Sequence, residues 1–108
     1  MTRRLVTLLA LALSAGPAAA SCYDVFGCSD QNVFRLKDLL DGPNCEFLYE
    51  MRNGIFAEHG YCFSSERGIA TFGNDNCRSS NVDALGLNRT ERTNVSTIAE
   101  AERLKGCR

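Results

Sequence analysis

The sequence predicts a small, mostly α-helical domain that is held together by disulfide bonds and follows a cleaved signal peptide. Three observations predict this class. The first twenty residues have the layout of a secretory signal, all six cysteines lie in the rest of the chain, and three segments combine helical periodicity with capping residues. No segment shows the alternation of apolar and polar residues that is typical of a strand.

The N-terminal segment predicts export. Arg3 and Arg4 precede an apolar run over residues 5–13, and small residues follow up to Ala20. This is the order of a signal peptide, and the apolar run is too short for a permanent membrane helix. We therefore predict a signal peptide over residues 1–20, with cleavage after Ala20.

The remaining chain is short and weakly acidic. It has 88 residues (108 − 20), 13 acidic side chains and 10 basic ones, because two of the 12 basic residues lie in the signal peptide. A net charge of −3 (10 − 13) argues against a nucleic-acid partner. A single domain of this size has a small core, so we expect disulfides to contribute to its stability.

The segment "PNCEFLYEMRNGIFAEHG" predicts a helix from about Cys45 to His59. Asn44 is a suitable N-cap, and Gly60 can end the helix in the left-handed conformation that glycine tolerates. Its apolar residues cover a broad arc, formed by Phe47, Leu48, Tyr49, Met51, Ile55 and Phe56. So broad an arc predicts a central helix that contacts several neighbours.

Two further helices follow. The first has Ser64 or Ser65 as its N-cap and ends at Gly73, with an expected inward face of Ile69, Ala70 and Phe72. In the second, Asn88 and Glu91 are spaced for a reciprocal cap and Gly106 ends the helix. Its inward stripe is expected at Val95, Ile98 and Ala101 or Glu102. A fourth helix is expected around residues 34–40, and residues 73–88 are expected to form a loop.

The six cysteines predict a disulfide framework because the count is even and the chain is exported. They are Cys22, Cys28, Cys45, Cys62, Cys77 and Cys107. An alternative is that Cys22 is the acylated residue of a lipoprotein. No two cysteines have the two-to-four-residue spacing of small zinc domains, and His59 is the sole histidine. We therefore expect no metal site and no cofactor.

Helix geometry restricts the disulfide pairing. Cys45 and Cys62 lie at opposite ends of a helix of about 15 residues, hence more than roughly 20 Å apart, whereas bridged Cα atoms are about 6 Å apart. The preferred pairs are Cys22 with Cys28, Cys62 with Cys77, and Cys45 with Cys107. The alternative pairs Cys45 with Cys77 and Cys62 with Cys107.

The residues from Leu48 to Cys77, "LYEMRNGIFAEHGYCFSSERGIATFGNDNC", and the segment "RTERTNVSTIAEAERLKGC" resemble the YARHG domain family. The motif corresponds here to Phe56, Ala57, Glu58, His59, Gly60 and Tyr61. Phe56 replaces the tyrosine of the motif, and Glu58 replaces its arginine. The resemblance covers about Cys45 to Cys107. We therefore divide the chain into a signal peptide (1–20), an N-terminal extension with a small disulfide loop (21–44) and a YARHG-like helical domain (45–108).

The resemblance implies a small extracytoplasmic bacterial module without an assigned activity. Within the helix that carries the motif, Arg52 and His59 fall inside the apolar arc. Half-buried polar side chains need partners, so two interpretations remain. Either Arg52 donates to backbone carbonyls or to an acidic neighbour and His59 packs at the helix end, or Arg52, Asn53 and His59 line a ligand-binding pocket.

A catalytic site is not expected. Neighbouring helix residues point in different directions, so neither Glu58 nor Glu50 is placed to orient His59. We predict an exported, monomeric, non-catalytic module in the periplasm or outside the cell, binding peptidoglycan or an envelope protein, with no nucleic acid and no membrane span after cleavage. The alternatives are a small cell-wall hydrolase and a secreted inhibitor or effector.

Overall fold

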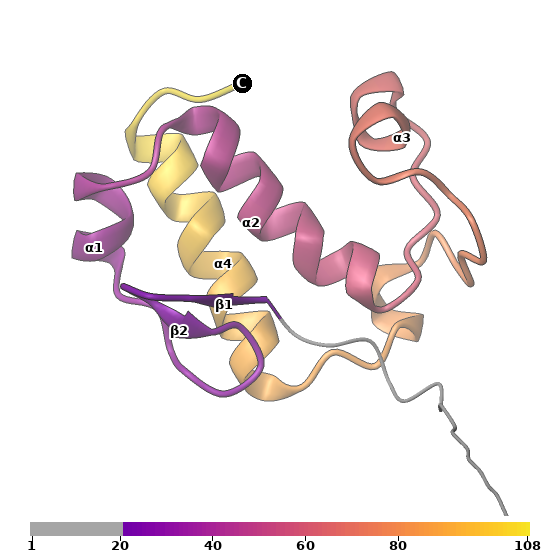
Figure 1. The fold of residues 1–108 in the computed structure, drawn as a ribbon, viewed down its shortest axis with the longest axis horizontal. Helices are drawn as coiled ribbons and strands as arrows, with labels where there is room; N and C mark the ends of the chain where they lie inside the picture. Colours follow the sequence, from indigo (N-terminus) through magenta and orange to yellow (C-terminus); the bar gives the residue numbers. More distant parts are fainter. Residues whose placement is uncertain (1–20) are drawn as a thin grey trace, which may run out of the picture.

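Four α-helices, one 3-10 helix and a two-stranded hairpin form residues 21–108, the part of the chain that the computed structural model describes (Figure 1). The predicted signal peptide, residues 1–20, lies outside the described residues. The elements follow in the order β1 (Cys22–Tyr23), β2 (Gly27–Cys28), α1 (Leu36–Asp41), α2 (Cys45–Glu58), α3 (Glu66–Phe72), η1 (Val82–Ala84) and α4 (Arg89–Leu104). The mostly α class is confirmed. Two-residue strands are too short to leave an alternating pattern in the sequence.

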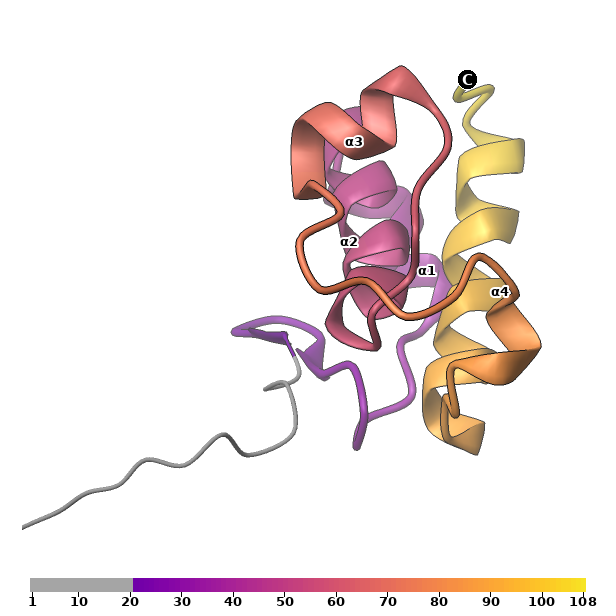
Figure 2. The same ribbon diagram turned by 90° about the vertical axis from the view of Figure 1, so that its right-hand side faces the viewer.

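Helices α2 and α4 form the centre of the domain, and they lie side by side in Figures 1 and 2. Helix α1 packs against α4, and α3 packs against α2. The shared core is formed by Phe34, Leu39, Leu48, Met51, Ile55, Leu85, Leu87, Ile98 and Ala101. The N-terminal extension therefore contributes Phe34 and Leu39 to the same core as the helices that follow it.

The predicted helix ends are found in the structure. The side chain of Asn44 accepts a hydrogen bond from the N–H of Phe47, and Ser65 caps α3. Asn88 and Glu91 form the reciprocal capping box at the start of α4. Gly60 follows α2 with φ +85°, a conformation that side-chain-bearing residues rarely adopt. These caps confirm the signals that define the helices.

The expected inward face of α3 is wrong for Ile69 and Ala70, whereas Phe72 does pack inward. Ile69 is 45 % exposed and Ala70 is exposed as well. The buried position is Gly68, against which the ring of Phe63 packs, and Phe72 stacks on Phe63 with 5.1 Å between ring centroids. The side of α3 that faces the domain is therefore the one with Gly68 and Phe72, because the ring of Phe63 from the preceding loop packs against it.

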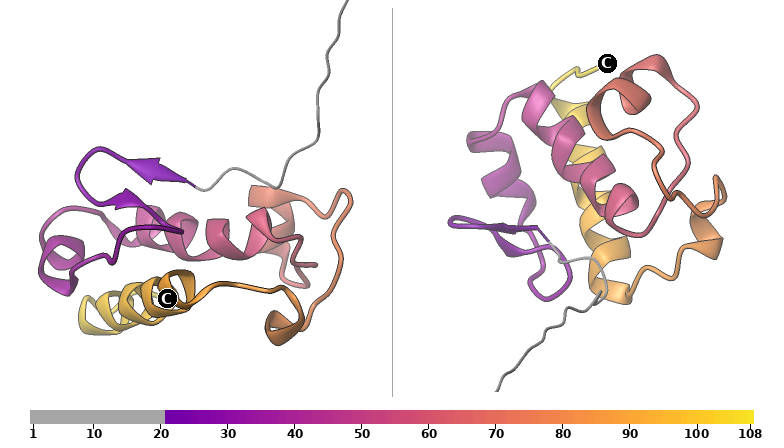
Figure 3. Two further views of the ribbon diagram at one scale, coloured as in Figure 1. Left: turned by 90° about the horizontal axis from the view of Figure 1, so that it is seen from below. Right: turned by 45° about the vertical axis from the view of Figure 1, so that its right-hand side comes forward.

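The N-terminal hairpin packs on α2, on the side away from α4 (Figure 3, left). Its strands are antiparallel, with Cys22 opposite Cys28 and Tyr23 opposite Gly27. Four aromatic rings from the hairpin, the segment before α1 and the first turn of α2 form a cluster with centroid distances of 5.7–6.2 Å: Tyr23, Phe26, Phe34 and Phe47.

The three disulfides are the preferred pairs from the sequence. They join Cys22 to Cys28, Cys45 to Cys107 and Cys62 to Cys77. No free cysteine remains in the described chain. In this structure the thiol of Cys22 is bonded to Cys28 rather than available for acylation.

Candidate functional site

An apolar cleft lies between the hairpin and the turn that joins α1 to α2. It has a volume of about 410 Å³ and is lined by Val25, Phe26, Asp38, Asp41, Gly42, Pro43 and Phe47. A second hollow of about 380 Å³ shares Val25, Phe26 and Phe47 and adds Cys22, Tyr23 and Asp24. We call the two together the hairpin cleft.

Two of the three side chains shared by both hollows are exposed although they are large and apolar. Val25 is 76 % exposed and Phe47 is 38 % exposed. The disulfide between Cys22 and Cys28, which are six positions apart, closes the hairpin and holds Val25 at its tip. An apolar surface in a concave site is the usual setting for a ligand contact.

Carboxylates dominate the polar groups around the hairpin cleft. Asp24, Asp38 and Asp41 line it, and neither hollow is lined by a basic residue. The Nε atom of Arg35 lies 3.5 Å from Oδ2 of Asp38, and the Nζ atom of Lys37 lies 3.4 Å from Oδ2 of Asp41. Both cations are largely exposed, and ion pairs of this kind are weak and screened by salt. The cleft therefore suits an apolar group that stands next to a positive charge.

The polar side chains that line the hairpin cleft are carboxylates and the phenol of Tyr23. The lining contains no serine, threonine or histidine, and its cysteine is in a disulfide. A serine or cysteine nucleophile with an adjacent histidine, an arrangement that acyl transfer commonly uses, is therefore not present in the lining of the hairpin cleft.

Arg52 is fully engaged across the helix pair. Its Nε lies 2.5 Å from Oε1 of Glu102, and its Nη2 lies 3.2 Å from Oε2. This two-point contact joins α2 to α4, and a guanidinium fork matches a carboxylate in this way. The structural interpretation of Arg52, as a donor to an acidic neighbour, agrees with this geometry.

His59 and Asn53 point to other partners. The Nε2 atom of His59 lies 2.8 Å from Oε2 of Glu91, whose side chain is 4 % exposed. Asn53 is buried and donates through Nδ2 to the carbonyl of Tyr49 at 3.1 Å. None of these residues, nor Arg52, lines the hairpin cleft. The three predicted ligand residues thus bond to three different partners, and the shared pocket proposed for them stays a prediction.

The remaining motif residues close α2. Phe56 packs on Tyr61 with 5.7 Å between ring centroids, and Tyr61 forms a bridge with Ser79. Glu58 accepts a hydrogen bond from the hydroxyl of Ser21. Burial raises the pKa of the Glu58 carboxyl, and the nearby Glu91 raises it further, against the lowering effect of the Ser21 contact.

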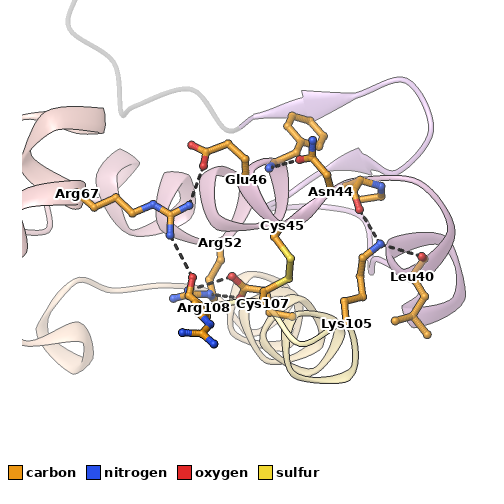
Figure 4. The surroundings of a disulfide bond; sticks show 12 residues. Leu40, Asn44, Cys45, Glu46, Arg52, Arg67, Lys105, Cys107 and Arg108 are labelled. Atoms are coloured by element: carbon orange, nitrogen blue, oxygen red, sulfur yellow. Dashed lines mark hydrogen bonds and ion pairs between the residues drawn. A yellow bond between two sulfur atoms is a disulfide. The ribbon is translucent and has the colours of Figure 1, made fainter.

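A group of polar contacts, which we call the polar corner, surrounds the Cys45–Cys107 disulfide (Figure 4). The Cys45–Cys107 disulfide joins the start of α2 to the chain just after α4. Beside it, the Nζ atom of Lys105 donates to the carbonyls of Leu40 at 3.1 Å and Pro43 at 2.9 Å. These contacts hold the α1–α2 turn in place, and Pro43 of this turn lines the hairpin cleft. The sequence offered no signal for Lys105, because its partners are backbone atoms about 60 positions away.

Arg67 of α3 belongs to the same corner. Its guanidinium carbon lies 3.6 Å from the centre of the Tyr49 ring, and Nη2 lies 2.9 Å from Oε1 of Glu46. It also donates to the carbonyl of Arg108 at 3.2 Å (Figure 4). A cation over an aromatic face is attractive, so Arg67 fastens α3 to α2.

Residues 21–108 contain no group of three or more His, Cys, Asp or Glu side chains placed to hold a metal ion. Over the same residues, no helix has both the length and the apolar character needed to cross a membrane.

Comparison with known proteins gives one match. Neither the curated proteins nor the solved structures contain a match to this chain. The sequence model of the YARHG domain matches residues 26–103. The match begins nearer the N-terminus than the resemblance in the sequence, at the tip of the hairpin, and it includes α1 and most of the hairpin cleft. The chain belongs to the YARHG domain family, a family of small extracytoplasmic domains of unknown function.

Proposed function

We propose that this protein is a non-catalytic binding module of the bacterial cell envelope and that the hairpin cleft is its binding surface. The preferred occupant is a segment of an envelope protein that presents an apolar side chain beside a lysine or arginine. The exported character of the family and the three disulfides support a location in an oxidising compartment.

The observation that carries this proposal is the composition of the hairpin cleft. An exposed apolar floor of Val25 and Phe47 lies next to the carboxylates of Asp38 and Asp41. Burying the floor against a partner would release water from apolar surface, and the carboxylates would select a cationic neighbour. The weak pairing of these acids with Arg35 and Lys37 leaves them available to a partner.

Site-specific photocrosslinking tests the surface. A photoreactive residue placed at Val25 should capture one envelope protein from a periplasmic extract, and the same residue at Ile69, which is 45 % exposed on α3, should not. An excess of the unmodified protein should compete with the probe at position 25 and reduce capture. The Val25→Lys variant should not compete, whereas the Ile69→Lys variant should compete as well as the unmodified protein. Equal capture from both positions would remove the cleft from consideration.

Peptidoglycan is the second partner that we predict from the sequence. Sedimentation of the oxidised protein with purified sacculi tests it directly. Binding that survives Val25→Lys would show a wall-binding surface elsewhere, and binding that is lost with it would replace the protein segment by a wall component as the occupant of the cleft.

The rival function is a small cell-wall hydrolase that uses His59. The 2.8 Å contact between His59 and the buried Glu91 is the arrangement that orients a histidine for proton transfer. Release of soluble muropeptides from sacculi, lost in His59→Ala, would establish this activity. We expect the purified protein to release none.

A further inference from the structure

Ser21, which follows the predicted cleavage site, contacts the end of α2. Its hydroxyl donates to Oε2 of Glu58, and its backbone N–H also faces this carboxylate and stabilises the charged form. The other carboxylate oxygen of Glu58, Oε1, is buried and has no hydrogen-bond partner in the described chain. The Glu58 carboxylate is thus half satisfied, and the backbone nitrogen of Ser21 is beside it.

The charges around Glu58 are unfavourable for an anion. Burial raises the pKa of Glu58, and repulsion by Glu91 of α4 raises it further. His59 has the opposite effect, but its ring nitrogen Nε2 is engaged with Glu91. Burial raises the pKa of the Tyr23 phenol on β1, and the nearby carboxylates of Glu58 and Glu50 raise it further. No lysine or arginine of residues 21–108 forms an ion pair with Glu58.

We propose that cleavage after Ala20 places the new α-ammonium group of Ser21 on the Glu58 carboxylate and so completes this site. Before cleavage the nitrogen is a neutral amide with a single N–H. After cleavage it is an ammonium group with positive charge and three donors, one of which can serve Oε1. The ion pair would join the start of the hairpin to the end of α2.

This step makes the stability of the fold depend on maturation. Within residues 21–108 no lysine or arginine pairs with the partly buried Glu58 carboxylate, and cleavage adds a cation next to it. Because Cys22 follows Ser21 directly, the same contact anchors β1. The inference rests on the predicted cleavage site and is independent of the proposed binding function.

The pH dependence follows from the two groups. The carboxylate raises the pKa of the α-amino group above its ordinary value of about 8 and is itself shifted down by the ammonium charge. The extra stability is present while both are charged. It is lost as the pH rises through the pKa of the α-amino group, and it is also lost as the pH falls through the pKa of Glu58.

A double comparison tests the ion pair. The oxidised protein that begins at Ser21 is compared with the same protein acetylated on Ser21, each with and without Glu58→Gln, which keeps the shape of the side chain. We expect the free amine to melt several degrees higher than the acetylated form at pH 7. The difference should disappear in Glu58→Gln and at a pH above the pKa of the α-amino group.

Two further measurements make the outcome decisive. Titration of the α-amino group by NMR in the unmodified protein should give a pKa above its ordinary range, returning to that range in Glu58→Gln. The mass of the exported protein should correspond to a chain that begins at Ser21. Equal melting of the free and acetylated forms with an ordinary α-amino pKa, or an exported chain with a different first residue, would overturn the proposal.

Discussion

At the scale of single residues, a buried amide holds the N-terminal segment on α4. Asn94 is 0 % exposed, and its Oδ1 accepts the N–H of Phe34 at 2.8 Å. Its Nδ2 donates to the carbonyls of Ser29 and Asn32, both at 2.9 Å. One side chain thus satisfies three backbone groups of a segment that has no regular structure. A buried backbone group without a partner is costly, so this residue determines where the segment lies.

Asn94→Ala should lower the free energy of unfolding by about 3 kcal/mol, because three buried backbone groups would lose their partner. Urea denaturation of the oxidised protein measures the change. Ser96→Ala, an exposed substitution in the same helix, is the control and should change stability by less than about 0.5 kcal/mol. A similar, small effect for both variants would show that water replaces the amide.

At the scale of elements, two helical glycines have opposite surroundings. A Cβ atom at Gly54 of α2 would meet nothing within 4 Å. At Gly68 of α3 it would come within 2.6 Å of the Phe63 ring and 3.0 Å of the Phe63 Cβ. That ring cannot move aside freely, because Tyr61 and Phe72 pack on it at 4.9 and 5.1 Å. Glycine therefore only lowers the helix propensity of α2 at position 54, whereas α3 requires it at position 68 so that Phe63 can pack there.

Gly54→Ala should stabilise the protein by about 1 kcal/mol, since alanine is the better helix former and the site has room. Gly68→Ala should destabilise it by about 1 kcal/mol or more, because overpacking outweighs the gain in helix propensity. Thermal melting of the two variants, each compared with the unchanged protein, checks both signs. Stabilisation by both substitutions would mean that Phe63 does not constrain α3.

At the scale of the whole molecule, the disulfides close loops of very different length. The sequence separation is 62 residues for Cys45–Cys107, 15 for Cys62–Cys77 and 6 for Cys22–Cys28. In the chain-entropy description, a longer loop restricts the unfolded chain more. The bond between the start of α2 and the end of α4 should therefore contribute most.

Replacing Cys45 and Cys107 together by serine should lower the free energy of unfolding by about 4 kcal/mol, against about 2 kcal/mol for Cys22 and Cys28. Denaturation under non-oxidising, thiol-free conditions compares the two variants. A larger effect of the hairpin bond would instead assign it a direct role in packing the aromatic cluster around Tyr23.

The features predicted from the sequence are those with local signals. Caps such as Asn44 and the Asn88–Glu91 box act over three residues, and the distance along a helix is enough to separate Cys45 from Cys62. Leu85 and Leu87 lie in a stretch that reads as loop, yet they are 2 % and 7 % exposed and belong to the core. Their burial depends on α4 folding back, which local periodicity does not contain.

The candidate site shows the same limit. Export and the family resemblance can be predicted from continuous stretches of sequence. The hairpin cleft instead combines Val25 with Asp41 and Phe47 from separate elements. A two-residue strand gives no periodic pattern, so nothing in the sequence placed Val25 opposite α1. Arg52 and His59 were candidate site residues because they are polar within an apolar arc. In the structure they pair with Glu102 and Glu91 of α4, respectively.

The bond between Cys45 and Cys107 also determines how the molecule would respond to tension. Of the 87 peptide steps between residues 21 and 108, 62 lie within the ring closed by this bond and 6 within the hairpin loop, which leaves 19 (87 − 62 − 6). Stretching the oxidised chain would therefore lengthen it to only about 65 Å, against about 300 Å after reduction. Helices α2, α3 and α4 would bear no load along their backbone, so a pull between the two termini would pass around them.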